Sequence, residues 1–281
     1  RIIKSWQANG ACVLMTAGGM NDAPALHRAD ISCSAEATAT DVAADAADIT
    51  LSDSSFANIR SMICQGRRIR ANLRHLTEFS MTCCIAQTLL AIVGGLVFRV
   101  NLLELLPLTV FNLLLFLFVQ PCFAYEPPAK DAMNKMPDHN DGALTGLFDK
   151  YRACMAGLYI LFNSMVSFMI GNGSFRLHAS GGGRTGITMA FAAMGLGLAL
   201  HAFCTRSDKP LASAGLFRNY RMLLSVLFTS AVVILMISVP YAAAMMGFSP
   251  LSLWEWGAIS VLLLIQLVVW EFPKIYCLVR F

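Results

Sequence analysis

Charged residues are scarce in this sequence. Asp, Glu, Lys and Arg make up 14% of its 281 residues, whereas soluble domains usually contain about 25%. Hydrophobic residues make up 57%, and the mean hydropathy is +0.61. These values exclude a single soluble domain and a disordered chain. The modest net charge of +4 excludes a strongly basic nucleic-acid-binding protein, so we expect no nucleic-acid partner.

Paired cysteines are lacking as well. The nine cysteines are scattered, odd in number and mostly set in apolar sequence, and no CxxC pair occurs. We therefore interpret them as small core residues rather than as a disulfide framework. The chain begins at Arg1, without a methionine or a signal peptide. We interpret it as a fragment, or as a protein that lacks its front.

Long uncharged runs dominate the sequence after residue 78. A hydrocarbon core about 30 Å thick needs about 20 apolar residues of helix. Six successive buried helices of a soluble protein would need a large polar shell, which this composition does not supply. The sequence therefore predicts a transmembrane domain over residues 79–281, in which Glu255 interrupts the last run at the interface. The six predicted helices cover about residues 79–98, 105–125, 153–175, 185–205, 222–243 and 251–270.

The distribution of Lys and Arg predicts the orientation in the membrane. Basic residues favour the cytosolic side of short loops. They are frequent before the first span, in every second loop and at the C-terminus, so we expect a multi-pass protein with both termini in the cytosol and place it in the plasma membrane. The residues of the basic side are Arg67, Arg68, Arg70, Arg74, Lys130, Lys135, Lys150, Arg152, Arg206, Lys209, Arg218, Arg221, Lys274 and Arg280, against Arg99, Arg176 and Arg184 on the opposite side.

The first 78 residues have a different character, with short apolar runs and frequent charges. Residues 1–55 read as half of an α/β domain, followed by a stalk helix over 56–78 that continues into the first span. Asn21 or Asp22 is expected to cap the first helix of this half-domain. The predicted strands cover 11–16, 30–34 and 49–51, and the predicted helices cover 23–29 and 41–47.

The turn after the first predicted strand carries a specific motif. Residues 16–26 read Thr-Ala-Gly-Gly-Met-Asn-Asp-Ala-Pro-Ala-Leu, which resembles the hinge motif T-G-D-G-x-N-D-A-P-A-L of P-type cation-transporting ATPases. The likeness continues through Ala46-Ala47-Asp48-Ile49, Glu126-Pro127-Pro128 and Met133-Asn134-Lys135-Met136-Pro137. Six spans after the hinge are typical of the type II branch with calcium and sodium–potassium pumps, where they would be the fifth to tenth helices.

The resemblance implies a fold, cofactors and partners. It implies that residues 1–55 are part of a phosphorylation domain with the haloacid-dehalogenase-like fold, that ATP and magnesium take part, and that the lipid bilayer and a missing N-terminal half with actuator and nucleotide-binding domains are partners. The hinge positions with implied catalytic roles are Asp22, Asn21 and Thr16; Gly19 lies by the cofactor. Asp22 is a candidate magnesium ligand or, equally, a helix cap.

The sequence departs from the family pattern at both sites. Gly18 stands where the family has the first hinge aspartate, and the phosphorylated motif D-K-T-G-T does not occur in the chain. On the implied transport path, Gln87 replaces a glutamate, whereas Asn112 is kept. Two neutral side-chain oxygens argue against a divalent-ion site of the usual type, because Ca²⁺ prefers six to eight oxygens with carboxylates among them.

Three functions remain open from the sequence. The leading hypothesis is the C-terminal portion of an ATP-driven cation transporter, which is not competent alone. The alternative is a catalytically dead relative that serves as a membrane scaffold or regulatory subunit, which the losses at Gly18 and Gln87 favour. A six-helix channel or permease has only its number of helices in its favour.

Overall fold

The computed structural model divides the chain into two compact units, residues 1–67 and 68–281. The structure describes residues 1–35, 39–52, 56–128, 133–134, 146–173, 183–215 and 217–280. The predicted end of the third span at residue 175 and the basic residues Lys130, Lys135 and Arg176 lie outside the described residues.

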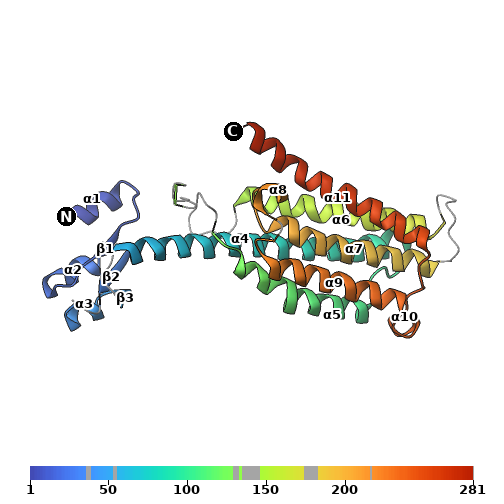
Figure 1. Cartoon of the computed structure of the whole chain (residues 1–281), viewed down its shortest axis with the longest axis horizontal. Coiled ribbons are helices and arrows are strands. Elements are labelled where there is room, and N and C mark those ends of the chain that lie inside the picture. Colours follow the sequence, from blue (N-terminus) through green and yellow to red (C-terminus); the bar gives the residue numbers. More distant parts are fainter. Residues whose placement is uncertain are drawn as a thin grey trace. The chain divides into compact units, whose positions relative to one another are not determined.

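The first unit contains a small parallel sheet with the strand order β1-β2-β3 (Figure 1). Leu14 of β1 pairs with Ile31 of β2, and Cys33 of β2 pairs with Ile49 of β3. Short helices connect the strands, and Leu26, Ala43 and Ala46 form their buried contact. The elements are α1 (Ile2–Ala8), β1 (Leu14–Thr16), the 3-10 turn η1 (Met20–Asp22), α2 (Ala23–Leu26), β2 (Ile31–Ala35), α3 (Asp41–Asp45) and β3 (Ile49–Leu51).

The predicted strands and helices of this unit occur, but most are shorter than expected. Strand β1 begins at Leu14 rather than at residue 11, because Asp30 takes up the preceding backbone: its Oδ2 accepts from the Val13 N–H at 2.8 Å. Helix α1 was not predicted. In the part of this unit that the structure describes, there is a small α/β arrangement with three strands and no clear haloacid-dehalogenase-like domain.

A single α-helix, α4, covers Phe56–Val93 and ends in a π-helical turn, η2 (Gly94–Phe98). Neither proline nor a run of glycines interrupts it, and these are the usual causes of a break in a helix. The predicted stalk over 56–78 and the start of the first span thus belong to one helix.

The second unit confirms the six predicted membrane-spanning helices. The described residues contain six helices that are long and apolar enough to cross a bilayer: Ala57–Phe98, Leu105–Tyr125, Asp149–Gly171, Arg184–Thr205, Tyr220–Ser238 and Leu253–Lys274. Their elements after α4 are α5 (Leu105–Leu114) with η3 (Leu115–Val119) and η4 (Gln120–Tyr125), α6 (Leu147–Gly171), α7 (Gly183–Thr205), α9 (Tyr220–Ser238) and α11 (Leu253–Arg280); α8 (Leu211–Ala214) and α10 (Pro240–Met246) are short.

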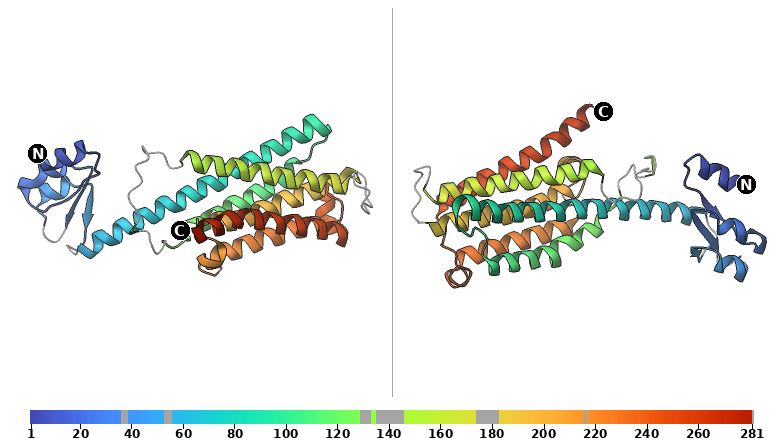
Figure 2. Two further views of the ribbon diagram at one scale, coloured as in Figure 1. Left: turned by 90° about the horizontal axis from the view of Figure 1, so that it is seen from above. Right: turned by 180° about the vertical axis from the view of Figure 1, so that it is seen from behind.

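Helix α7 forms the centre of this bundle. It packs against α6, α9 and α11 (Figures 1 and 2), and 83% of its apolar segment is buried, against 17–44% for the other five spans. Small residues allow the close approach of α6 and α7. A Cβ atom added at Gly186 would lie 2.9 Å from the Phe168 carbonyl oxygen, as is common where membrane helices pack through glycine.

The third, fifth and last spans have bounds that differ from the prediction. The fifth span ends at Ser238 instead of 243, because Pro240 keeps the preceding Val239 out of the helical region, with φ −82° and ψ 118°. The third span belongs to a helix that begins at Leu147, six residues before the predicted start at 153, because the charged residues that precede the apolar run are also helical. The last helix begins at Leu253 and continues past Pro273 to Arg280.

Candidate functional site

The structure places the hinge residues in one turn at the carboxyl end of β1. Thr16 ends the strand, Gly18 and Gly19 form the turn, and Asn21 and Asp22 lie in η1. The Gly18 carbonyl oxygen accepts from the N–H of Thr40 at 3.0 Å, which ties the turn to the start of α3. The predicted hinge positions thus lie together. They lie at the edge of the sheet where parallel strands commonly bind ligands.

Asp22 does not serve as a side-chain cap. It occupies the N-cap position of α2, but no side-chain capping hydrogen bond forms there. Its carboxylate instead lies over the turn, since a Cβ atom added at Gly19 would be 3.1 Å from Asp22 Oδ2. Asp22 had two interpretations, a helix cap and a magnesium ligand. The hydrogen bond that a side-chain cap would make is not seen.

The hinge does not fit a magnesium site built by this chain alone. In the described part of the chain, no group of three or more His, Cys, Asp or Glu side chains could hold a metal ion. Gly18 contributes no side-chain oxygen, so Asp22 is the one carboxylate of the turn, beside the exposed Asn21 and Thr16. Mg²⁺ prefers octahedral oxygen coordination, which this arrangement does not supply.

The two transport-path candidates contact each other across α4 and α5. Gln87 Nε2 donates to Asn112 Oδ1 at 2.8 Å, and Asn112 Nδ2 donates to Gln87 Oε1 at 3.2 Å. Gln87 is half-buried and Asn112 is exposed in the second unit. The pair therefore forms a reciprocal polar contact between α4 and α5.

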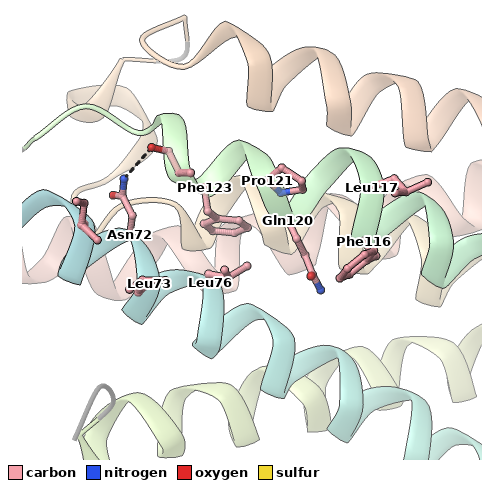
Figure 3. A pocket seen from close by; sticks show the side chains of 10 residues that line it. Asn72, Leu73, Leu76, Phe116, Leu117, Gln120, Pro121 and Phe123 are labelled. Atoms are coloured by element: carbon pink, nitrogen blue, oxygen red, sulfur yellow. Dashed lines mark hydrogen bonds between the residues drawn. The ribbon is translucent and has the colours of Figure 1, made fainter. Parts of the chain in front are cut away.

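An apolar pocket lies between α4 and the η3–η4 segment (Figure 3). Its volume is about 420 Å³, within the usual range for ligand pockets of about 300–1,000 Å³. Leu73, Leu76, Phe116 and Phe123 line it, and Asn72 bridges its edge by donating to the Ala124 carbonyl oxygen at 3.4 Å. The predictions from sequence did not include this pocket, because its two walls, residues 69–76 and 116–124, come from different helices that are far apart in the sequence.

A cluster of charged residues at the end of the bundle where α6 begins was also missed. Glu78 is 1% exposed, and its Oε1 lies 3.1 Å from the Nε of Arg152. Asp208 accepts from Arg74 at 2.6 Å and from Arg152 at 3.2 Å. Burial raises the pKa of Asp208, but the charges of His75, Arg74 and Arg152 outweigh it and lower that pKa to about 2. Arg74 and Glu78 lie one turn apart on α4, but their ion-pair partners come from distant parts of the sequence.

A second polar network was not predicted either. Arg206 is 2% exposed and donates to the Gly215 carbonyl oxygen at 2.7 Å. Its guanidinium lies 4.5 Å from the Phe203 ring centroid and 4.0 Å from Glu126 Oε2. Asn219 donates to the same Glu126 oxygen at 2.9 Å. These contacts join the ends of η4, α7 and α9, while Arg206 Nε and Nη1 stay buried without a hydrogen bond from the described residues.

Comparison with known proteins identifies the second unit. A family model described as "Cation transporting ATPase, C-terminus" matches residues 101–276. "Calcium-transporting ATPase 1" of Bacillus cereus is 29% identical over 98% of this chain and 32% of that protein. "Calcium-transporting ATPase" of Bacillus subtilis is 29% identical over 86% of this chain and 26% of that protein. Human "Calcium-transporting ATPase type 2C member 1" is 36% identical over 52% of this chain and 16% of that protein.

The chain thus spans less than a third of the length of each of these relatives. The family match falls within the six-helix bundle, and the longest of these alignments extends over nearly the whole chain, hinge included. The resemblance that the hinge motif indicated is confirmed by these matches. The chain is an integral, multi-pass membrane protein that belongs to the family of cation-transporting ATPases and corresponds to their C-terminal region.

Proposed function

We propose that this chain supplies the membrane-spanning C-terminal part of an ATP-driven cation transporter, with Ca²⁺ as the candidate ion. The observation that carries the proposal is the family match over residues 101–276, which covers the second to sixth of the six spans. The ion follows from the three relatives compared above, which are calcium-transporting ATPases. The transporter is not competent through this chain alone, because the chain contains no D-K-T-G-T motif.

The proposed organisation assigns residues 1–55 to a partial phosphorylation domain of the haloacid-dehalogenase-like type, residues 56–78 to a stalk and residues 79–281 to the membrane. A parallel sheet with a glycine turn after β1 supports the first assignment. The protein would lie in the plasma membrane. Both of its termini would be in the cytosol, as the bias of Lys and Arg favours. Actuator and nucleotide-binding domains would be the partners.

Gln87 and Asn112 are the proposed transport-path residues. Each amide oxygen currently accepts a hydrogen bond from the other amide, at 2.8 and 3.2 Å. A passing cation would have to replace both hydrogen bonds and take the two oxygens as ligands. Because both oxygens are neutral, a divalent ion needs further oxygens, carboxylates included, from elsewhere in the transporter.

The hinge residues Asp22, Asn21, Thr16 and Gly19 are proposed to lie near the transferring phosphoryl group in the complete enzyme. ATP would supply the phosphoryl group, and magnesium would neutralise its charge when bound. This chain contributes the turn itself: β1 and the contact between Gly18 and Thr40 position it, and Asp22 adds one carboxylate. The other magnesium ligands would come from outside this chain.

The test uses membrane vesicles that contain the natural gene product in its full length. We expect acid-stable phosphoprotein from ATP and ATP-dependent uptake of ⁴⁵Ca²⁺. Asn112→Ala should lower uptake by about tenfold, whereas Thr109→Ala, one turn away on α5 with its hydroxyl bonded to the Leu105 carbonyl oxygen, should leave it unchanged. Absence of both phosphoprotein and uptake in the unmodified protein would contradict the proposal and support the scaffold alternative.

A further inference from the structure

The charged cluster around Glu78 is not explained by the proposed transport path. Glu78 belongs to α4 and is 1% exposed, and its Oε1 lies 3.1 Å from Arg152 Nε of α6. Its second oxygen, Oε2, is buried and accepts no hydrogen bond from the described residues. A buried carboxylate that depends on one cation is fixed in place, because its separation from that cation leaves an uncompensated charge.

Arg152 extends the contact to a third segment. Its Nη1 donates to Asp208 Oδ1 at 3.2 Å, and Asp208 lies in the segment between α7 and α8. Arg74 of α4 donates to both oxygens of Asp208, at 2.8 and 2.6 Å. Arg74 and Arg152 thus share Asp208, and a planar guanidinium holds such contacts in a fixed orientation.

Among the described residues, no cation other than Arg152 forms an ion pair with Glu78, although the charge of Arg74 acts on it at longer range. On α6, Asp149 Oδ1 lies 3.8 Å from Arg74 Nε. On α4, His75 is 5% exposed and its Nε2 lies 4.0 Å from Asp208 Oδ2. On α11, Lys274 donates to Glu271 at 3.2 Å and to the carbonyl oxygens of Cys204 and Ser207. Glu78 therefore relies on Arg152.

We propose that Glu78, Arg74, Arg152 and Asp208 form a clamp that fixes α4 to α6 and to the segment between α7 and α8, so that the three move as one piece during transport. Arg152 and Asp208 act as positioning residues, since they act on transport through the orientation of α4. The link to transport rests on the proposed function. The physical basis is that removing one partner of a buried ion pair is costly, because the other partner is left buried without its counter-charge.

Hydrogen–deuterium exchange of the full protein in detergent tests the clamp directly. In Arg152→Gln, backbone amides of α4 around residues 74–82 and of residues 206–210 should exchange together, about tenfold faster than in the unmodified protein. The matched control is Lys150→Gln, an exposed position of the same helix, which should change neither segment. Unchanged exchange in both segments of Arg152→Gln would overturn the clamp.

A charge reversal separates the ion pair from general damage. Glu78→Arg and Arg152→Glu should each accelerate exchange, whereas the double variant should bring the exchange of α4 around residues 74–82 back to within about threefold of the unmodified protein. Exchange in the segment that carries Asp208 should stay fast in the double variant, because a carboxylate at position 152 faces that of Asp208. If a single variant does not fold, Arg74→Gln, at a position that is 29% exposed in its side chain, serves as the milder change and should still release residues 206–210. A double variant in which α4 exchanges as fast as in either single variant would contradict the pairing.

The consequence for transport is measured in the same vesicles as ATP hydrolysis. Arg152→Gln should lower the number of ions taken up per ATP hydrolysed by about fivefold, while hydrolysis itself remains. An equal fall of both activities would indicate a structural role alone and would overturn the transport part of the proposal. If the unmodified protein neither hydrolyses ATP nor takes up calcium, the proposed function fails, and the exchange measurement still decides whether the clamp exists.

Discussion

At the scale of single residues, Gly18 decides what the hinge can bind. Its φ is not positive, and its carbonyl oxygen, not a side chain, makes the contact to Thr40. The backbone conformation of Gly18 is therefore one that other residues also adopt. The turn keeps the geometry of a strand followed by a helix, whereas its carboxylates are reduced to Asp22.

Gly18→Asp should restore a second carboxylate to the hinge. Two carboxylates in one turn attract a divalent ion more strongly than one, so we expect the variant to bind Mn²⁺, used as a spectroscopic probe for Mg²⁺, about tenfold more tightly by electron paramagnetic resonance. The control is Gly66→Asp, where a Cβ atom meets nothing within 4 Å. Equal Mn²⁺ affinity of the Gly18→Asp variant and the unmodified chain would show that the second carboxylate does not reach the ion.

Asp208 should make stability depend on pH in the acid range. Its pKa is lowered in the folded protein to about 2 from an ordinary value of 3.8. The folded state therefore binds this proton less readily than the unfolded state, and the contribution of Asp208 to stability is complete above about pH 4 and lost as the pH falls toward 2. The melting temperature of Asp208→Asn should lie below that of the unmodified protein at pH 6. The two temperatures should converge near pH 2; a constant difference would contradict this assignment.

At the scale of elements, the close approach of α6 and α7 depends on glycine. A Cβ atom at Gly186 would lie 2.9 Å from the Phe168 carbonyl oxygen, so Gly186→Ala should push the helices apart and destabilise the bundle by about 1–3 kcal/mol. Gly195→Ala, on the same helix, meets only ordinary contacts, the nearest at 3.4 Å from Phe111, and should cost little. Thermal unfolding in detergent compares the two; equal melting temperatures would contradict the packing argument.

The elements also show what the sequence can predict. Strand β3, the glycine turn and the six spans follow from local patterns, because short strands, Gly-Gly turns and 20-residue apolar runs each have a local physical cause. The start of α6 was missed because a search for uncharged runs stops at Asp149 and Arg152, which are helical and ion-paired. The proline at 240 was a readable signal for the break after Ser238.

The candidate sites divide in the same way. The hinge residues lie together because they are neighbours in sequence, and the contact of Gln87 with Asn112 follows from two adjacent spans. The partners Arg74 and Asp208 are 134 residues apart, and no local pattern pairs them. Only the packing of α4, α6 and the segment after α7 brings these charges together, so the clamp was beyond prediction from the sequence.

At the scale of the whole molecule, the topology in the membrane joins these proposals. If both termini are cytosolic, the segment of residues 206–210, which carries Asp208, is cytosolic and the segment between α10 and α11 is on the opposite side. The clamp then lies on the side where ATP is present, and Gln87 and Asn112 lie farther along α4 and α5 toward the other side.

Glycosylation mapping tests this topology. A long polar cassette with an Asn-Gly-Thr acceptor is inserted after Gly247, between α10 and α11, or after Asp208, and each protein is made in the presence of microsomes. Because basic residues stay on the cytosolic side, the cassette after Gly247 should be glycosylated and the one after Asp208 should not. The reverse pattern would place the clamp away from ATP and contradict both the orientation and the role of the clamp in transport. Glycosylation at both positions would contradict the single span, α9, between them, because one span places the two cassettes on opposite sides of the membrane.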